Sequence, residues 1–182
     1  MKTTVRGLLG FVLLAMCFML WGCEAGNAVQ DTQNSDTQIS EPQPSENAPK
    51  QAVDFSLPNI NGETITLSSL KGQKVLLDFW ATWCPPCRSE LPDMNGMVTE
   101  LKNKGIVVLN ISVDGDIETV KRFIERYHYS NLSVLFDDKA IAEKYSVSAI
   151  PTKILIDETG IMIAQYVGAL SGTELQKFLE LN

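Results

Sequence analysis

The sequence predicts an α/β domain in which a central mixed β-sheet is flanked by helices. Two observations carry this prediction. Apolar runs typical of buried strands alternate with helix-like segments over residues 74–145, and two more strand patterns and a helix follow over residues 153–181. Because helical crossovers favour parallel neighbouring strands, we expect a mainly parallel sheet that is mixed at one edge.

The individual elements follow from local patterns. Apolar and polar residues alternate on both sides of Asn61-Gly62, which predicts a β-hairpin over residues 54–67. The apolar run Val75-Leu76-Leu77 is typical of a buried central strand over residues 74–80. The same reasoning predicts, in order, a helix over 86–102 that Pro92 should kink, a strand over 106–113, a helix over 116–127, a strand over 132–136, a helix over 138–145, strands over 153–157 and 161–167 and a helix over 171–181.

The N-terminal region has the layout of a secretory signal. Lys2 and Arg6 precede an apolar run from Leu8 to Trp21, so residues 1–22 predict a targeting segment. The following Cys23 completes Leu20-Trp21-Gly22-Cys23, which resembles the lipobox of bacterial lipoproteins and implies that Cys23 is lipidated. The alternative is an uncleaved membrane anchor. Both place the domain outside the cytoplasm, tethered to a membrane of a bacterial cell envelope, where disulfides persist.

Residues 23–50 predict a disordered linker, because they are mostly polar and their only large apolar residues are Val29 and Ile39. The folded domain should then span residues 51–182. The chain carries 15 Lys and Arg against 22 Asp and Glu, for a net charge of −7, and contains no basic block. This balance argues against nucleic-acid binding, and we expect a monomer.

The motif Cys84-Pro85-Pro86-Cys87 carries the chemistry. Two intervening residues at the start of a helix bring both sulfurs within disulfide reach. Cys84 should lie at the helix N-terminus, where unpaired N–H groups and the helix dipole favour its thiolate, the attacking species in disulfide exchange. Cys87, one turn deeper, should be the shielded resolving thiol.

Other uses of this cysteine pair fit less well. A zinc site needs about four ligands, but the chain offers one histidine, His128, and no second cysteine pair in the domain. Arg88 occupies the place that haem attachment reserves for histidine, and a structural bridge across so short a loop would add little stability. We therefore expect no metal and no cofactor beyond the redox-active Cys84–Cys87 disulfide.

The segment from Asp78 to Cys87 looks like the active-site segment of the thioredoxin superfamily, and residues 52–182 resemble its extracytoplasmic TlpA/ResA-like, AhpC/TSA-related branch. The resemblance implies a thioredoxin-like fold with an N-terminal hairpin at 54–67 and an αβ insertion at about 116–136. It also implies a cis peptide bond before Pro151, which would expose the backbone of Ile150 to an extended substrate chain. The alternative is an ordinary strand-entry proline. The residues expected to contact substrate are Trp83, Pro85, Pro86, Ile150, Pro151 and Thr152, whereas Trp80 should belong to the core.

Three acidic residues are candidates for supporting roles. Asp78 lies inside an apolar strand, where an unpaired carboxylate would be costly and its pKa should rise. We expect Asp78 to help move the proton of Cys87, the alternative being a carboxylate satisfied by local backbone or water. The resemblance also implies an acid near the dithiol after the strand ending at Val113, either Asp114, which we favour, or Asp116. The alternative is that both are solvated acids at a strand end and a helix start.

These expectations describe a thiol–disulfide oxidoreductase that reduces disulfides of exported proteins, among them apocytochrome c by resemblance, and is re-reduced by a DsbD/CcdA-type membrane donor. Direction of electron flow stays open, because redox poise depends on the surroundings of Cys84. One alternative is a thiol peroxidase. Thr82, however, stands two positions before Cys84, whereas the threonine of the peroxiredoxin motif stands three positions before its cysteine. The other is a non-catalytic client-binding or metal-binding module.

Overall fold

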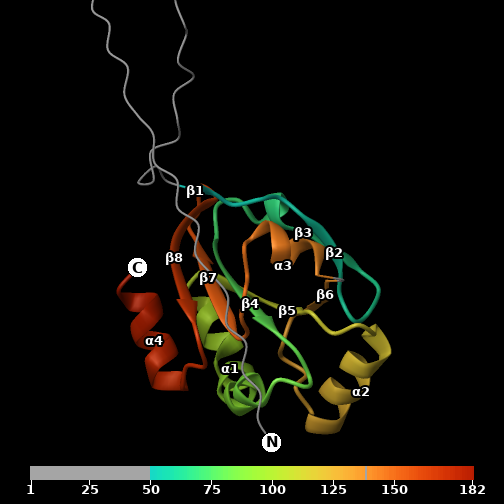
Figure 1. Cartoon of the computed structure of the whole chain (residues 1–182). Coiled ribbons are helices and arrows are strands. Elements are labelled where there is room, and N and C mark those ends of the chain that lie inside the picture. Colours follow the sequence, from blue (N-terminus) through green and yellow to red (C-terminus); the bar gives the residue numbers. More distant parts are fainter. Residues whose placement is uncertain (1–49, 138) are drawn as a thin grey trace, which may run out of the picture. The chain divides into compact units, whose positions relative to one another are not determined.

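The computed structural model describes residues 50–137 and 139–182, which form a mixed sheet with helices packed against it (Figure 1). The six strands of this sheet are hydrogen-bonded in the order β1-β8-β7-β4-β5-β6. Their bounds, in that order, are Lys50–Gln51, Ile161–Val167, Thr152–Ile156, Lys74–Trp80, Ile106–Ser112 and Val134–Phe136. The predicted N-terminal hairpin forms a separate two-stranded sheet from β2, Ser56–Pro58, and β3, Thr64–Thr66, followed by the short 3₁₀ helix η1, Leu67–Leu70.

The predicted helices are all present, and their ends lie within two residues of the expected ones. They are α1, Pro85–Asn103; α2, Ile117–Tyr127; α3, Ala140–Lys144; and α4, Gly172–Glu180. Pro92 lies inside α1, which is helical on both sides of it. Ser171 forms a capping box at the start of α4, since its hydroxyl accepts from the Glu174 N–H while the Glu174 carboxylate accepts from the Ser171 N–H.

The sheet is mixed, as expected, but it is not mainly parallel. Strands β4, β5 and β6 are parallel, but β7 runs antiparallel to β4, β8 antiparallel to β7, and β1 antiparallel to β8. The five-residue helix α3 covers only about 7 Å at 1.5 Å per residue. It is too short to return the chain along the length of a strand, so β7 enters the sheet in the reverse direction.

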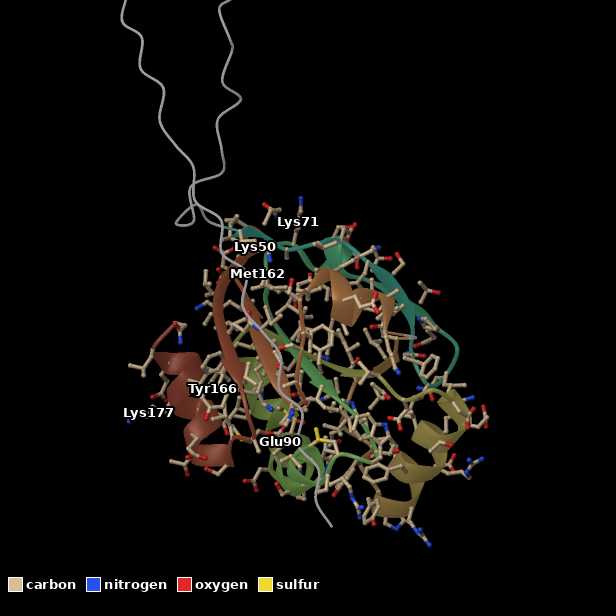
Figure 2. The ribbon with its side chains drawn as sticks, viewed as in Figure 1. Lys50, Lys71, Glu90, Met162, Tyr166 and Lys177 are labelled. Carbon is tan, nitrogen blue, oxygen red and sulfur yellow. A yellow bond between two sulfur atoms is a disulfide. The ribbon has the colours of Figure 1, made fainter. Side chains whose placement is uncertain are left out.

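The ordered domain includes a residue that the sequence assigned to the linker. Lys50 pairs with Met162 across β1 and β8, at the sheet edge labelled in Figure 2. The predicted targeting segment, Cys23 and the rest of the linker lie outside the described residues. Within the described part of the chain, no helix combines the length and the apolar character needed to cross a membrane.

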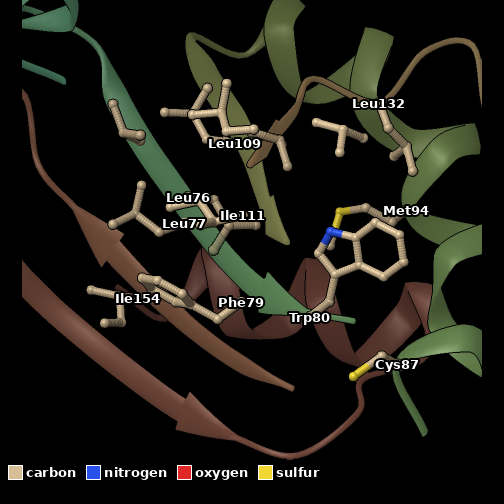
Figure 3. Close-up of a cluster of buried hydrophobic side chains, with 14 of the residues drawn as sticks. Leu76, Leu77, Phe79, Trp80, Cys87, Met94, Leu109, Ile111, Leu132 and Ile154 are labelled. Atoms are coloured by element: carbon tan, nitrogen blue, oxygen red, sulfur yellow. The ribbon is translucent and has the colours of Figure 1, made fainter. Parts of the chain in front are cut away.

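The core lies on both faces of β4, because successive side chains of a strand point to opposite sides. Phe79 packs against Tyr145 at the end of α3, with ring centroids 5.9 Å apart. Trp80, on the other face, is fully buried as predicted and packs against Phe123 of α2. Figure 3 shows Cys87 at the edge of this cluster, beyond Trp80, so the dithiol adjoins the hydrophobic core.

Candidate active site

The two cysteines are joined by a disulfide at the start of α1. The buried strand β4 ends at Trp80, and a short loop then leads to Cys84, which is the N-cap of α1. Cys84 is 3% exposed and Cys87 is fully buried. Cys84 is therefore the more accessible of the two cysteines.

The helix end is arranged to stabilise negative charge on Cys84. Pro85 and Pro86 occupy the first two helical positions and have no N–H, so the first amide of the helix that can donate is that of Cys87. This amide donates to Cys84 Sγ at 3.2 Å. The first turn carries no acidic residue, and Arg88 follows directly. After reduction, the same N–H and the positive end of the helix dipole would favour a thiolate at Cys84.

The Ile150–Pro151 peptide bond is cis, as the resemblance implied. The carbonyl oxygen of Ile150 lies 3.8 Å from Cys84 Sγ, so the loop before β7 faces the dithiol directly. A groove of about 300 Å³ adjoins this point and includes Trp83, which is 64% exposed, together with Ile150 and the apolar side chains of Val113, Ala142 and Val147. An extended peptide could therefore reach both Cys84 and an apolar surface.

The predicted substrate contacts are only partly available. Pro85 and Pro86 are exposed beside Cys84, and Ile150 is half-buried. Thr152, in contrast, is 1% exposed, and its hydroxyl donates to the Ala149 carbonyl at 2.6 Å. The expectation that Thr152 contacts substrate is therefore corrected: its side chain is used inside the loop, where it shapes the turn around the buried Pro151.

Asp114 and Asp116 have different surroundings. Asp114 is 3% exposed and accepts hydrogen bonds from the Thr82 N–H at 3.0 Å, the Thr82 hydroxyl at 2.6 Å and the Ser112 hydroxyl at 2.7 Å. Asp116 caps α2 by accepting from the N–H groups of Glu118 and Thr119. Of the two candidates, Asp114 is therefore the one that contacts the loop leading to Cys84.

Asp78 is fully buried, but it is not the unpaired carboxylate that the sequence suggested. Its Oδ2 accepts from Asn110 Nδ2 at 3.0 Å. Its Oδ1 lies 3.1 Å from Lys153 Nζ, an ion-pair contact that lacks hydrogen-bond alignment. The partners are side chains from the two neighbouring strands, β5 and β7, instead of local backbone or water. The expectation of an unpaired carboxylate at this position is therefore wrong.

Two functional candidates were missed by the sequence analysis, Lys153 and Glu90. Lys153 Nζ also contacts Glu90 Oε1, and Glu90 Oε2 accepts from the Leu170 N–H at 2.9 Å. Lys153 is fully buried and Glu90 is 3% exposed. Burial, followed by the charge of Asp78, raises the pKa of Glu90 to about 7, although the charge of Lys153 opposes the shift.

The position of Glu90 connects this ion-pair cluster to the dithiol. Glu90 follows Cys87 by three residues on α1, so both side chains share the buried face of the helix. Figure 2 shows Glu90 close to the disulfide. The sequence did contain a signal for both missed residues. Glu90 stands at helical spacing from Cys87 and Met94, and Lys153 opens an apolar strand, so each places a charge where a core residue is expected.

The described residues contain no group of three His, Cys, Asp or Glu side chains arranged to hold a metal ion.

The comparisons with known proteins point to disulfide chemistry. Residues 48–165 match the model of the AhpC/TSA family. The chain belongs to the AhpC/TSA family. Its relatives include the thiol-disulfide oxidoreductase ResA of Halalkalibacterium halodurans, 35% identical over 134 residues that cover 74% of this chain and 76% of ResA.

Two further comparisons agree with this family membership. The thioredoxin-like protein YneN of Bacillus subtilis is 38% identical over 73% of this chain and 79% of its own length. The crystal structure of the pneumococcal exposed lipoprotein thioredoxin Etrx1 of Streptococcus pneumoniae superposes with a TM-score of 0.65, at 32% identity, over 71% of this chain and all of the other. This AhpC/TSA-family chain therefore has a thioredoxin-like fold and is a thiol–disulfide oxidoreductase.

Proposed function

We propose that the protein is a membrane-tethered reductant of disulfides in exported proteins, with Cys84 as the nucleophile and Cys87 as the resolving thiol. The observation that carries this proposal is the position of Cys84. Its sulfur lies at a helix N-terminus, accepts the Cys87 N–H, and faces the Ile150 carbonyl beside an apolar groove. This is the arrangement that a nucleophile needs to meet an extended polypeptide.

The reaction proceeds in two exchanges. The Cys84 thiolate attacks one sulfur of the client disulfide, a Cys84–client disulfide forms, and the other client sulfur leaves as a thiolate. Cys87 then gives up its proton and attacks Cys84 Sγ, which releases the second client thiolate and leaves the Cys84–Cys87 disulfide. The client gains two electrons and the dithiol loses two. Asp78 is the buried base that we assign to the proton of Cys87.

The proposal also includes a membrane anchor, an electron donor and a client protein. Anchoring would come from the lipidated Cys23, in agreement with the name of Etrx1 as an exposed lipoprotein. Reduction of the Cys84–Cys87 disulfide would require a DsbD/CcdA-type membrane donor. Apocytochrome c is the client that the TlpA/ResA-like resemblance implies, because its haem-attachment cysteines have to be reduced.

The direction of electron flow is tested by the reduction potential of the Cys84–Cys87 pair, measured by equilibration with glutathione. We expect a value well below about −120 mV, which is the potential of a strong oxidase. A value near −120 mV would contradict the proposed role as a reductant.

The division of roles is tested with envelope extracts, in which Cys87→Ser should accumulate client disulfides on Cys84 and the matched Cys84→Ser should accumulate none. Peroxide consumption faster than disulfide exchange would instead favour the peroxidase alternative.

A further inference from the structure

Lys153 lies at the centre of a row of polar side chains that crosses the sheet. Strand register pairs Lys153 with Asp78 of β4 and with Tyr166 of β8, and it pairs Asp78 with Asn110 of β5. Directly paired residues point to the same face of a sheet. Glu90 of α1 lies over this row, because its carboxylate reaches Lys153 Nζ.

Burial of such a cluster of charged groups costs free energy, and the cost depends on the balance between its positive and negative charges. Among the described residues, Lys153 is the only lysine or arginine that is buried. Its ammonium is matched by two carboxylates, so the cluster carries one negative charge when all three groups are ionised. Without the ammonium, the same two carboxylates would carry two negative charges in a site that excludes water, and one of them would keep its proton to higher pH.

The other polar groups within hydrogen-bond distance of the cluster are neutral. The Gly168 carbonyl lies 3.5 Å from Lys153 Nζ, and the Leu170 N–H donates to Glu90. Tyr166 is partly exposed and packs against Phe178 of α4. Asp93, one turn beyond Glu90, accepts from the Gly172 N–H at the surface. Cys87 precedes Glu90 by three residues on the buried face of α1. In the described part of the chain, Lys153 is the only positively charged side chain that forms ion pairs with the two buried acids.

We propose that Lys153 is a positioning residue for the resolving step: its ammonium holds the carboxylates of Asp78 and Glu90 together behind Cys87 and keeps the cluster ready to accept one proton. This inference rests on the proposed role of Cys87. The Cys87 S–H bond breaks and its proton passes to a carboxylate of the cluster. The sulfur electron pair forms the bond to Cys84, and the Cys84–client bond breaks with its electron pair leaving on the client sulfur.

The proposal is tested by separating the two exchanges in time. Reduced protein is mixed with one equivalent of 5,5′-dithiobis(2-nitrobenzoate), an aromatic disulfide whose released thiolate is coloured. Attack by Cys84 releases the first thiolate, and attack by Cys87 on the mixed disulfide releases the second. Stopped-flow absorbance over a range of pH therefore gives one rate for each cysteine, and the first rate is an internal control for folding and access.

In Lys153→Met, we expect the second phase to slow about tenfold near neutral pH and its pH profile to move upward by about one unit, because the cluster then keeps its proton. The first phase should stay unchanged. The matched control is Lys177→Met, which removes an exposed lysine of α4 and should alter neither phase. An unshifted second-phase profile in Lys153→Met, or equal slowing of both phases, would overturn the proposal.

A second pair of variants keeps the test decisive if Lys153→Met does not fold. Glu90→Gln leaves Asp78 with Lys153, whereas Lys153→Met/Glu90→Gln leaves Asp78 with Asn110 and removes one charge of each sign. We expect the second-phase profile of the double variant to lie at higher pH than that of Glu90→Gln. Coincident profiles would refute a role for Lys153. Since both phases report only on the dithiol, they remain valid if the reduction potential contradicts the proposed direction.

Discussion

The carboxylate of Asp114 accepts hydrogen bonds from both the backbone N–H and the hydroxyl of Thr82, at 3.0 and 2.6 Å. These bonds connect the end of β5 to the loop that carries Cys84. A third bond from Ser112 fixes the carboxylate itself. The loop before the nucleophile is thus held by an element distant in sequence, and Asp114 is the residue through which it is held.

Replacing Asp114 by alanine should release this loop. Loss of a buried, charge-assisted acceptor should lower the free energy of unfolding by about 1–3 kcal/mol, and the attack of Cys84 on an aromatic disulfide should slow because its loop is no longer fixed. The control Asp116→Ala removes the cap of α2, which should cost about 1 kcal/mol and leave the attack rate unchanged. Equal effects of the two variants on attack would contradict a specific role for Asp114.

Glu90 should make the stability of the oxidised protein fall as the pH rises. Its pKa is raised from 4.5 to about 7, so between these values the folded chain binds more protons than the unfolded chain. The contribution is complete below pH 4.5 and is lost as the pH rises through about 7, a change of roughly 3 kcal/mol. Urea unfolding of Glu90→Gln across this range should lack the decline.

A carboxylate of opposite behaviour provides the control for Glu90. The hydroxyl and backbone N–H of Ser171 lower the pKa of Glu174. Its contribution to stability is therefore present above the unfolded pKa and is lost as the pH falls. Glu174→Gln should retain the decline between pH 4.5 and 7, and a loss of the decline in both variants would show that it does not originate at Glu90.

Trp83 should affect protein substrates and leave the fold intact. The side chain is 64% exposed, so Trp83→Ala should change the free energy of unfolding by no more than about 0.5 kcal/mol. An exposed aromatic that anchors a partner contributes more than about 1 kcal/mol, so KM for a disulfide-containing protein should rise about tenfold, with unchanged reactivity toward a small aromatic disulfide. Leu181→Ala, exposed near the C-terminus, should leave KM unaltered.

Ser171→Ala should change stability alone. It removes one half of the capping box at the start of α4, and we expect a loss of about 1 kcal/mol in urea unfolding. The reduction potential and both exchange rates should match those of the unchanged protein. A shifted potential would show that α4 communicates with the dithiol through the Leu170–Glu90 hydrogen bond.

The elements of the fold were predictable because their signals are local. Strand and helix periodicity, the Asn61-Gly62 turn and the Ser171 cap depend on residues close together in sequence. The direction of β7 was not predictable in this way, since it depends on where the short helix α3 ends relative to the sheet.

The same distinction holds for the active site. Cys84, Cys87 and Pro151 stand in short motifs, whereas the pairing of Asp78 with Lys153 is created by strand register. From the sequence alone, Asp78 was therefore assigned no side-chain partner. Glu90 was missed for a related reason, because the residues it contacts, Lys153 and Leu170, come from later segments.

The register that joins Asp78 to Lys153, and the helical turn that brings Glu90 to both, also constrain how this sequence can evolve. Loss of the lysine alone leaves two buried carboxylates without a positive partner. Loss of the lysine together with one acid keeps the net charge of the cluster at one negative. Among homologues, positions 78, 90 and 153 should therefore covary. A lineage that replaces the lysine with an apolar residue should also have lost one of the two acids.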